Sequence, residues 1–274
     1  MKKVGAVVFS PTGTTAEVCR AIAEAVPDAQ ADLLNITLPA EREKLMSDPT
    51  VMADTYDRLI FGVPVYAGKV PKFAEEIITE IKGKGKPATA VAVYGNRDYG
   101  VSVKSLADLL TRNGFVVDSA GAFIGQHTYS DIVPMATGRP DSGDAKIAGN
   151  LGRRLSGTLR PLKDGEIPVE LDDFSTSDDQ SGIVPFHDES ECKECGVCAE
   201  HCPRGIIEAG TGKYISQEAM KTCLGCFGCV QACPNNGRQL KVPDQMRSQL
   251  EMMFSEVAKN RREPIYIVGE KAAV

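Results

Sequence analysis

Eight of the nine cysteines fall into two short runs with identical spacing, C-x2-C-x2-C-x3-C-P. The first run consists of Cys192, Cys195, Cys198 and Cys202 followed by Pro203, and the second of Cys223, Cys226, Cys229 and Cys233 followed by Pro234. Zinc sites use C-x2-4-C pairs rather than tetrads that end in Cys-Pro, and disulfides need an oxidising compartment, of which the sequence shows no sign. The spacing therefore favours thiolate ligands of iron–sulfur clusters.

This double run resembles that of bacterial ferredoxins, which carry two [4Fe–4S] clusters. In that family, the first three cysteines of a run bind one cluster and the fourth, just before the proline, binds the other. The resemblance implies one ligand set of Cys192, Cys195, Cys198 and Cys233, and a second set of Cys223, Cys226, Cys229 and Cys202. Because the ligation is crossed, we expect that neither half folds alone.

A second candidate site is the hexapeptide Ser10-Pro11-Thr12-Gly13-Thr14-Thr15. It follows an apolar run over residues 3–9, and a helical pattern continues from it to about Val26. Backbone N–H groups at the start of a helix, together with the hydroxyls, can surround a phosphate. The loop is neither a Walker loop nor a Rossmann fingerprint, because it lacks Gly-Lys-Ser/Thr and G-x-G-x-x-G. A threonine-rich capped turn without a ligand is the alternative.

The elements that would position this loop alternate between strand and helix. Apolar, β-branched runs predict strands over residues 3–9, 31–36, 56–62, 88–94, and 115–119 with 122–125, the last with an expected interruption near Gly121. Helical patterns follow them over residues 14–26, 37–46, 70–81, 101–112 and 142–159, the last with Asp141 as N-cap. This alternation predicts an α/β fold with a doubly wound parallel sheet.

The hexapeptide closely resembles the S/T-x-T-G-x-T phosphate loop of flavodoxins. The resemblance implies a flavodoxin-like strand order 2-1-3-4-5, with FMN held beyond the carboxyl ends of strands one, three and four. The FMN contacts that it implies are Ser10, Thr12, Gly13, Thr14, Thr15, Pro64, Val65, Tyr66, Ala67, Gly68, Tyr94, Gly95, Asn96, Tyr99 and Gly100. Tyr66 and Tyr99 would face opposite sides of the flavin ring, where flavodoxins commonly have a tryptophan that this chain lacks. Ordinary amphipathic surface tyrosines are the alternative.

His127 follows the fifth predicted strand, at the same end of the sheet. It is a candidate catalytic proton donor to the flavin because imidazole titrates near neutral pH. A lone histidine on a loop is more often structural, so both interpretations stay open. Residues 135–143 form a predicted flap before the last helix. Cys19, the ninth cysteine, falls in a helical pattern and is expected to be a small buried hydrophobe.

These features predict two domains. A flavodoxin-like FMN-binding domain is expected over residues 1–160, an acidic linker over 161–185, a smaller α+β 2[4Fe–4S] ferredoxin domain over 186–242, and a C-terminal helix and tail over 243–274. In the ferredoxin domain, residues 183–187 should pair with 239–242, and 206–208 with 214–216.

The C-terminal region is expected to contain an amphipathic helix from Pro243 to about Asn260 and a short edge strand over 264–268. The helix carries an apolar stripe of Met246, Leu250, Met253, Phe254 and Val257. We interpret this stripe as intrachain core, packed on one domain or between both, rather than as a docking surface for a partner.

Composition and charge restrict the class of protein. Hydrophobic residues make up 42% and charged residues 25%, as in soluble globular chains. The net charge of −6 is unevenly placed, since residues 164–194 hold eleven acidic residues and one lysine. This stretch is either a surface that steers basic redox partners or a solvated linker. Without a basic face, nucleic-acid binding is disfavoured. No stretch is long enough to span a membrane, and the N-terminal apolar run is too short for a signal peptide, so a cytoplasmic protein of an anaerobe is expected.

Taken together, the two halves resemble the flavodoxin–ferredoxin fusion proteins of anaerobes. The resemblance implies an iron–sulfur flavoprotein that relays low-potential electrons between two [4Fe–4S] clusters and FMN, to or from a redox protein such as a ferredoxin or reductase. One alternative is a cluster-fed, FMN-dependent reductase of a small acceptor of the quinone, nitro or enone type. A ferredoxin with a flavin-free docking domain is another. No nicotinamide-binding motif is recognisable.

Overall fold

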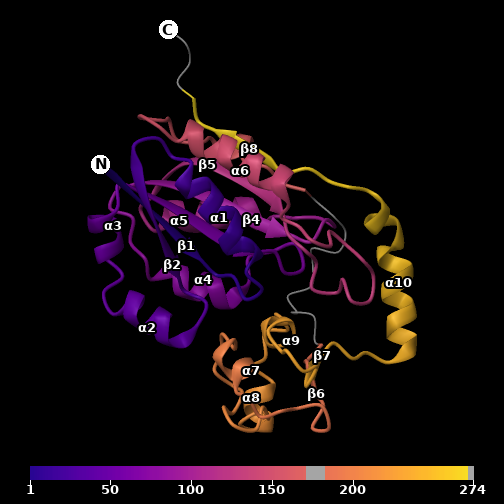
Figure 1. Cartoon of the computed structure of the whole chain (residues 1–274). Coiled ribbons are helices and arrows are strands. Elements are labelled where there is room, and N and C mark those ends of the chain that lie inside the picture. The colour runs from indigo at the N-terminus through magenta and orange to yellow at the C-terminus, as the bar shows by residue number, and fades with distance from the viewer. Residues whose placement is uncertain (171–182, 271–274) are drawn as a thin grey trace.

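The computed structural model of this protein describes residues 1–170 and 183–270. A larger domain is built round one β-sheet and is called the α/β domain below, and a smaller cysteine-rich domain lies beneath it (Figure 1). A long helix near the C-terminus runs beside both domains and returns the chain to the edge of the sheet. The C-terminal strand therefore belongs to the α/β domain in space.

The sheet has the strand order β2-β1-β3-β4-β5-β8, in which the first five strands are parallel and β8 is antiparallel to β5. The strands are β1 (Lys2–Val8), β2 (Ala29–Asn35), β3 (Arg58–Pro64), β4 (Pro87–Tyr94), β5 (Val116–Ile124) and β8 (Ile265–Val268). The predicted order 2-1-3-4-5 and the predicted edge strand are both confirmed. In this order, the carboxyl ends of β1 and β3 flank the point where the chain reverses direction across the sheet.

Helices cover both faces of the sheet. The helices of this domain are α1 (Thr14–Glu24), α2 (Pro39–Met46), α3 (Val51–Thr55), α4 (Lys72–Thr79), α5 (Ser102–Arg112) and α6 (Ser142–Arg154). Helices α4 and α5 pack on one face, and α1 and α6 on the other. Helix α3 was not predicted, and α6 is shorter than predicted. Asp141 caps α6 as predicted, in a capping box with Asp144.

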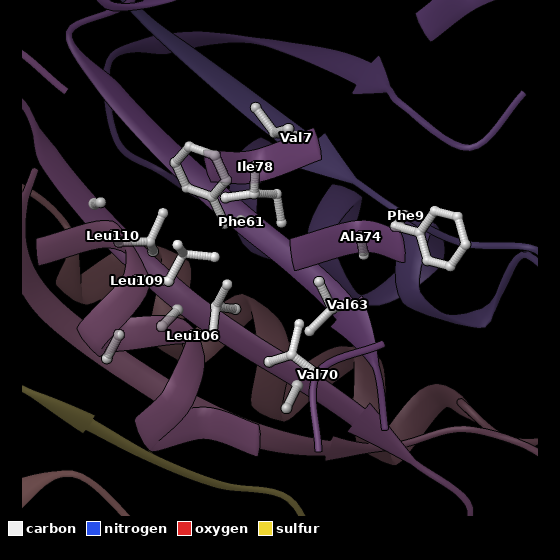
Figure 2. Close-up of a cluster of buried hydrophobic side chains, with 14 of the residues drawn as sticks. Val7, Phe9, Phe61, Val63, Val70, Ala74, Ile78, Leu106, Leu109 and Leu110 are labelled. Atoms are coloured by element: carbon white, nitrogen blue, oxygen red, sulfur yellow. The ribbon is translucent and has the colours of Figure 1, made fainter. Parts of the chain in front are cut away.

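The continuous apolar strands are explained by burial on both faces. Val7 and Phe61 point into the core beneath α4 and α5 (Figure 2), whereas their neighbours Val8 and Ile60 point into the core beneath α1 and α6. A strand covered on both sides has no solvent face, so its sequence does not alternate between apolar and polar residues.

Cys19 lies in the second of these cores and is fully buried, as predicted. Its Sγ occupies the space above Gly62, where an added Cβ would lie 2.2 Å from the sulfur. Burial raises the pKa of the Cys19 thiol, because the thiolate would lose its hydration. The residue therefore acts as a packing group.

Strand β5 is continuous, so the predicted interruption near Gly121 is wrong. The absence of a side chain at Gly121 instead lets β8 approach, since a Cβ there would lie 2.8 Å from the carbonyl oxygen of Ile265. The irregularity in β5 occurs at Asp118. In the register with β4, Ala88 is opposite Val117 and Thr89 is opposite Ser119, so no residue of β4 is opposite Asp118. Asp118 receives both terminal nitrogens of Arg58 at 2.7 and 2.6 Å, and both side chains are buried.

The cysteine-rich domain contains short elements only. They are β6 (Phe186–His187), α7 (Val197–Glu200), α8 (Gln217–Met220), α9 (Gly228–Gln231) and β7 (Arg238–Gln239). The predicted pairing near its two ends is present but shorter, with Phe186 opposite Gln239. The predicted hairpin is reduced to a single bridge between Ile207 and Tyr214. Small elements suffice because four-cysteine loops, rather than a sheet, organise this region.

Helix α10 (Asp244–Lys259) packs between both domains, through one narrow face. Phe254 is buried against Tyr129 of the loop after β5 and lies in one cluster with Phe227 of the cysteine-rich domain. Met246 and Met253 are 39% and 45% exposed, so their assignment to the core is wrong. The helix touches its neighbours along the Phe254 side only, which leaves the flanking methionines at the surface.

The predicted linker is only partly within the described residues, since 171–182 fall outside them. Its described part includes a 3-10 turn (Asp164–Glu166) and runs along the α/β domain. Leu162 donates from its N–H to the carbonyl of Val117, and Glu170 does so to the carbonyl of Gly100. The start of the linker is therefore attached to the sheet domain.

Candidate functional site

The eight cysteines of the two runs line two separate cavities. One cavity is lined by Cys192, Cys195, Cys198 and Cys233, and the other by Cys202, Cys223, Cys226 and Cys229. We call these sets the outer and the inner cysteine group. Each joins three cysteines of one run to the fourth of the other, the grouping that the ferredoxin resemblance implies. No ligand set for a single metal ion is found within residues 1–170 and 183–270, whereas a cubane takes its thiolates at separate iron atoms around a volume.

The two runs form their loops with the same backbone conformations. Left-handed residues occur in three matched pairs with φ between 54° and 78°, namely Glu194 with Gly225, Gly196 with Phe227, and Gly205 with Asn236. The second left-handed residue of each run, Gly196 or Phe227, immediately precedes a short helix, α7 or α9. This helix carries the third cysteine of the run. The repeated cysteine spacing thus corresponds to a repeated structure.

The two groups differ in exposure. Cys195 of the outer group is exposed, whereas Cys202, Cys226 and Cys229 of the inner group are each 7% exposed. Burial raises the pKa of Cys226 to about 12, because a thiolate without hydration or a cation is costly. Bound iron removes that cost, since a coordinated thiol is deprotonated.

The hydroxyls of the loop after β1 divide into structural and cavity-facing groups. Ser10 Oγ accepts a hydrogen bond from the N–H of Ala16 at 3.0 Å, and Thr15 is buried. Thr12 and Thr14 line the adjoining cavities. Two of the predicted phosphate contacts therefore face a ligand space with their side chains, and two stabilise the loop itself.

The start of α1 is suited to an anion. Gly13 begins the helix in the left-handed conformation, at φ 86°. Among the hydrogen bonds of the described residues, none uses the amide N–H of Thr14 or Thr15, as is usual in a first helical turn. These donors and the positive end of the helix dipole fit a phosphate group.

Loops after β1, β3, β4 and β5 meet at one cavity of about 110 Å³, which we call the loop cavity. It is lined by Pro11, Thr12, Thr14, Pro64, Val65, Tyr66, Ala67, Val93, Tyr94, Gly95, Arg97, Asp98, Gly125, Gln126, His127 and Thr128. A wider interdomain cavity of about 480 Å³ shares five of these residues and is closed by the cysteine-rich domain on its other side. The loops that were expected to hold FMN therefore converge.

Tyr66 lines the loop cavity, but Tyr99 does not. Tyr99 is 6% exposed and packs edge-on against Tyr94, with ring centroids 5.5 Å apart. The expected position of Tyr99 across from Tyr66 is thus not observed, because its ring is part of the core beneath α4 and α5. Tyr94 lines the cavity instead.

Asn96, Gly68 and Gly100 join elements rather than line the cavity. The side-chain amide of Asn96 donates to the carbonyls of Val257 and Asn260 at 3.1 and 2.7 Å, which ties the loop after β4 to the end of α10. Gly68 and Gly100 let two loop backbones touch, since a Cβ on Gly100 would lie 2.3 Å from the Gly68 oxygen. These residues set the shape of the cavity without facing it.

His127 lies at both cavities, with its ring against Gly95, Tyr129 and Phe254. Its Nδ1 accepts a hydrogen bond from the N–H of Tyr129 at 3.0 Å, so the neutral ring carries its proton on Nε2. Burial, and then the charge of Arg97, lower the pKa of His127 to about 4. At neutral pH the ring can therefore donate a hydrogen bond, but it is not a cationic acid.

Arg97, Gln126 and Thr128 line the loop cavity and were not predicted as contacts. Arg97 lies 5.7 Å above the ring of Phe254 and 3.2 Å from the carboxylate of Asp98. In the sequence, only their position could have indicated that these three residues line the cavity, because all three occur in loops already assigned to this end of the sheet.

Buried nitrogen atoms of two side chains beside the outer cysteine group, the buried Arg238 and the half-buried His187, support an iron–sulfur ligand there. Nε and Nη1 of Arg238 and Nε2 of His187 have no hydrogen-bond partner among the described residues. Both side chains line the cavity of the outer group. Sulfur atoms of clusters accept hydrogen bonds, so donors without a protein acceptor fit this position.

Comparison with known proteins identifies the cysteine-rich domain. Residues 184–234 match the family described as 4Fe-4S dicluster domain. An uncharacterized ferredoxin of Methanocaldococcus jannaschii is 34% identical over 53 residues, which cover 19% of this chain and 36% of that protein. The match thus spans about a third of the length of this curated relative. The domain is a ferredoxin-type iron–sulfur domain.

Solved structures are similar to the α/β domain at low sequence identity. An archaeal flavodoxin is 17% identical, with 55% of this chain and 93% of that chain covered and a TM-score of 0.39. An NADH:FMN oxidoreductase in its apo form is 19% identical, with coverages of 56% and 87% and a TM-score of 0.41. The rubredoxin oxygen:oxidoreductase of Desulfovibrio gigas is 19% identical, with 56% of this chain and 34% of that chain covered and a TM-score of 0.40.

The chain thus joins an α/β domain with flavodoxin-like strand order to a ferredoxin-type domain. Within the described ranges, no helix has the length and apolar character that crossing a membrane requires.

Proposed function

We propose that this protein relays low-potential electrons between two [4Fe–4S] clusters and FMN, to or from a redox partner. The observation that carries the proposal is the position of the inner cysteine group against the loops that were expected to hold the flavin. Leu224 and Cys226 belong to the same buried cluster as the core of the α/β domain, and Tyr66 packs against that cluster. Tyr66 also lines the loop cavity, so it connects this cavity with the buried cluster that contains Cys226.

The proposed ligands of the two clusters are the outer and inner cysteine groups. FMN would be held at its phosphate by the first-turn amides of α1 with Thr12 and Thr14. Tyr66 in the loop after β3 and Tyr94 at the end of β4 would line its ring, and His127 would offer the Nε2–H. When bound, clusters exchange single electrons, whereas a flavin exchanges one or two.

The exposure of the cysteines suggests the order in which electrons pass through the two cysteine groups. Cys195 of the outer group is open to solvent, and Cys226 of the inner group is enclosed beside Tyr66. A redox protein would therefore exchange electrons at the outer group, because electron transfer needs close approach. The inner group would connect it to the flavin loops.

Stopped-flow reduction tests this relay in anaerobically purified protein of known iron and FMN content. Cys226→Ser should slow the reduction of FMN by an external reduced ferredoxin at least tenfold, while FMN stays bound. Cys19→Ala is the matched control, since Cys19 lies outside both groups, and it should reduce at the normal rate. The internal step should not depend on protein concentration. A rate that is equal without the inner cluster, or proportional to protein concentration, contradicts the proposal.

The interdomain cavity favours a second candidate function, a reductase of a small acceptor. Its lining is mostly polar and includes Thr12, Gln126, His127 and Ser130. Such a space could admit a quinone or nitro compound beside the flavin site. Steady-state assays with these acceptors and reduced ferredoxin, without a further protein, distinguish the two. Turnover supports the reductase, and its absence supports the carrier.

A further inference from the structure

Arg238 is a buried cation beside the outer cysteine group. It is 2% exposed, begins β7, and lines the cavity of that group. Its Nη2 donates to the carbonyl oxygen of Gly212, and within the described residues no carboxylate pairs with it. A buried guanidinium without a counter-ion is strongly unfavourable, so the folded protein needs a negative group near it.

The position of the unpaired N–H groups identifies where that negative group lies. Nε and Nη1 of Arg238 are fully enclosed. Arg238 also lines the interdomain cavity of about 480 Å³, but an N–H that faced this open space would be exposed. The enclosed N–H groups belong to a side chain that also lines the narrow cavity of the outer cysteine group. Gly212 lines the same cavity, and a Cβ on it would lie 3.3 Å from Cys192 Sγ and 3.6 Å from Cys198 Sγ.

Arg238 is also close to the inner group. Its guanidinium lies 4.5 Å from the ring centroid of Tyr214, whose hydroxyl donates to the carbonyl oxygen of Pro185 at 3.1 Å. Tyr214 also lines the cavity of the inner group. One cation thus lies near both cysteine groups.

We propose that Arg238 is a positioning residue that tunes the redox chemistry of both cluster sites, by charge and by N–H donation to sulfur. In each one-electron reduction the cluster gains the electron that the reductant loses, and the site becomes more negative by one charge. A nearby cation in a dry interior stabilises that added charge, and hydrogen bonds to sulfur have the same effect. Arg238 therefore raises both reduction potentials, and more so at the outer group that it lines.

Redox titration followed by electron paramagnetic resonance tests this inference on the full chain. Arg238→Met should lower the equilibrium constant for reduction of the outer cluster at least tenfold, which is about 59 mV for one electron. A smaller decrease is expected at the inner cluster. Arg238→Lys keeps the charge and should restore most of the loss. Lys241→Met removes an exposed cation paired with Asp188 and should leave both potentials unchanged.

Both potentials unchanged in Arg238→Met, with full iron and sulfide content, would overturn the proposal. If that variant does not assemble its clusters, Arg238→Gln and Arg238→Lys are compared instead, and equal potentials in these two contradict a role of the charge. The inference rests on the proposed function only in that the cysteine groups bind clusters. The spectra report the clusters without flavin or partner, so a failed relay and a failed tuning role are distinguishable.

Discussion

The imidazole of His127 takes its protonation state from its own loop and from two other segments of the chain. The N–H of Tyr129 fixes the tautomer, Arg97 from the loop after β4 adds positive charge, and Phe254 of α10 contributes to burial of the ring. None of these influences is visible in the residue type. A side chain that titrates near pH 6.5 in water is thereby kept neutral beside the loop cavity.

We expect the ring resonances of His127 to keep their neutral values from pH 8 to pH 5.5 in nuclear magnetic resonance spectra. The pKa is lowered to about 4 in the folded state, so the unfolded chain binds the proton more readily. The resulting stability, about 3 kcal/mol at most, is present above pH 6.5 and is lost as the pH falls towards 4. Arg97→Gln should move the midpoint upward. Titration of His127 near 6.5 in the unmodified protein would show that the ring is hydrated.

At the scale of single elements, an irregular position in strand β5 forms a buried ion pair with strand β3. The irregular position in β5 presents Asp118 to Arg58 of β3, across the intervening strand, and Thr89 and Ser119 complete the hydrogen-bond network. A buried pair of this kind depends on both partners, because either charge alone is expensive in the interior.

Asp118→Asn should therefore destabilise the α/β domain by about 3–5 kcal/mol, since Arg58 stays buried without a counter-charge. Urea unfolding followed by circular dichroism measures the change. Asp54→Asn is the matched control, because the Lys84–Asp54 pair has side chains 44% and 62% exposed, and it should cost less than about 1 kcal/mol. Equal costs for the two substitutions would mean that water reaches Arg58.

At the scale of the whole molecule, the two domains touch through backbone as well as side chains. Phe73 of α4 contacts the guanidinium groups of both Arg42 and Arg204, which lie 5.1 and 4.9 Å from its ring centroid. Gly228 of α9 approaches the loop after β1 so closely that a Cβ would lie 2.7 Å from the Pro11 oxygen. The cysteine-rich domain thus contacts the loop after β1, which lines the loop cavity.

Gly228→Ala should separate these surfaces and slow the transfer of electrons from the clusters to FMN, with iron content preserved. The added methyl cannot fit without moving the loop at Pro11 or the helix α9. Stopped-flow absorbance measures the rate, and direct reduction of FMN by dithionite checks that the flavin site is intact. Gly210→Ala is the control, because nothing lies within 4 Å of the added Cβ. An unchanged rate in Gly228→Ala would show that this contact does not govern the transfer.

The sequence by itself determined the parts whose chemistry is local. Cysteine spacing, the threonine-rich turn and the apolar runs each depend on a few neighbouring residues, so the two cysteine groups, the strand–loop–helix unit at residues 2–24 and the parallel sheet could be predicted. The implied crossed grouping of Cys202 and Cys233 also agrees with the two cavities.

Only the tertiary structure decided how side chains from distant segments meet. Tyr99 turned into the core, two methionines of α10 remained exposed, and Arg238 became enclosed between the cysteine groups. Each outcome depends on which surfaces the folded chain brings together, and burial changes the energy of a charge or an aromatic ring far more than its neighbours in sequence do. The same residue types in the same order would serve other purposes if α10 and the cysteine-rich domain packed elsewhere.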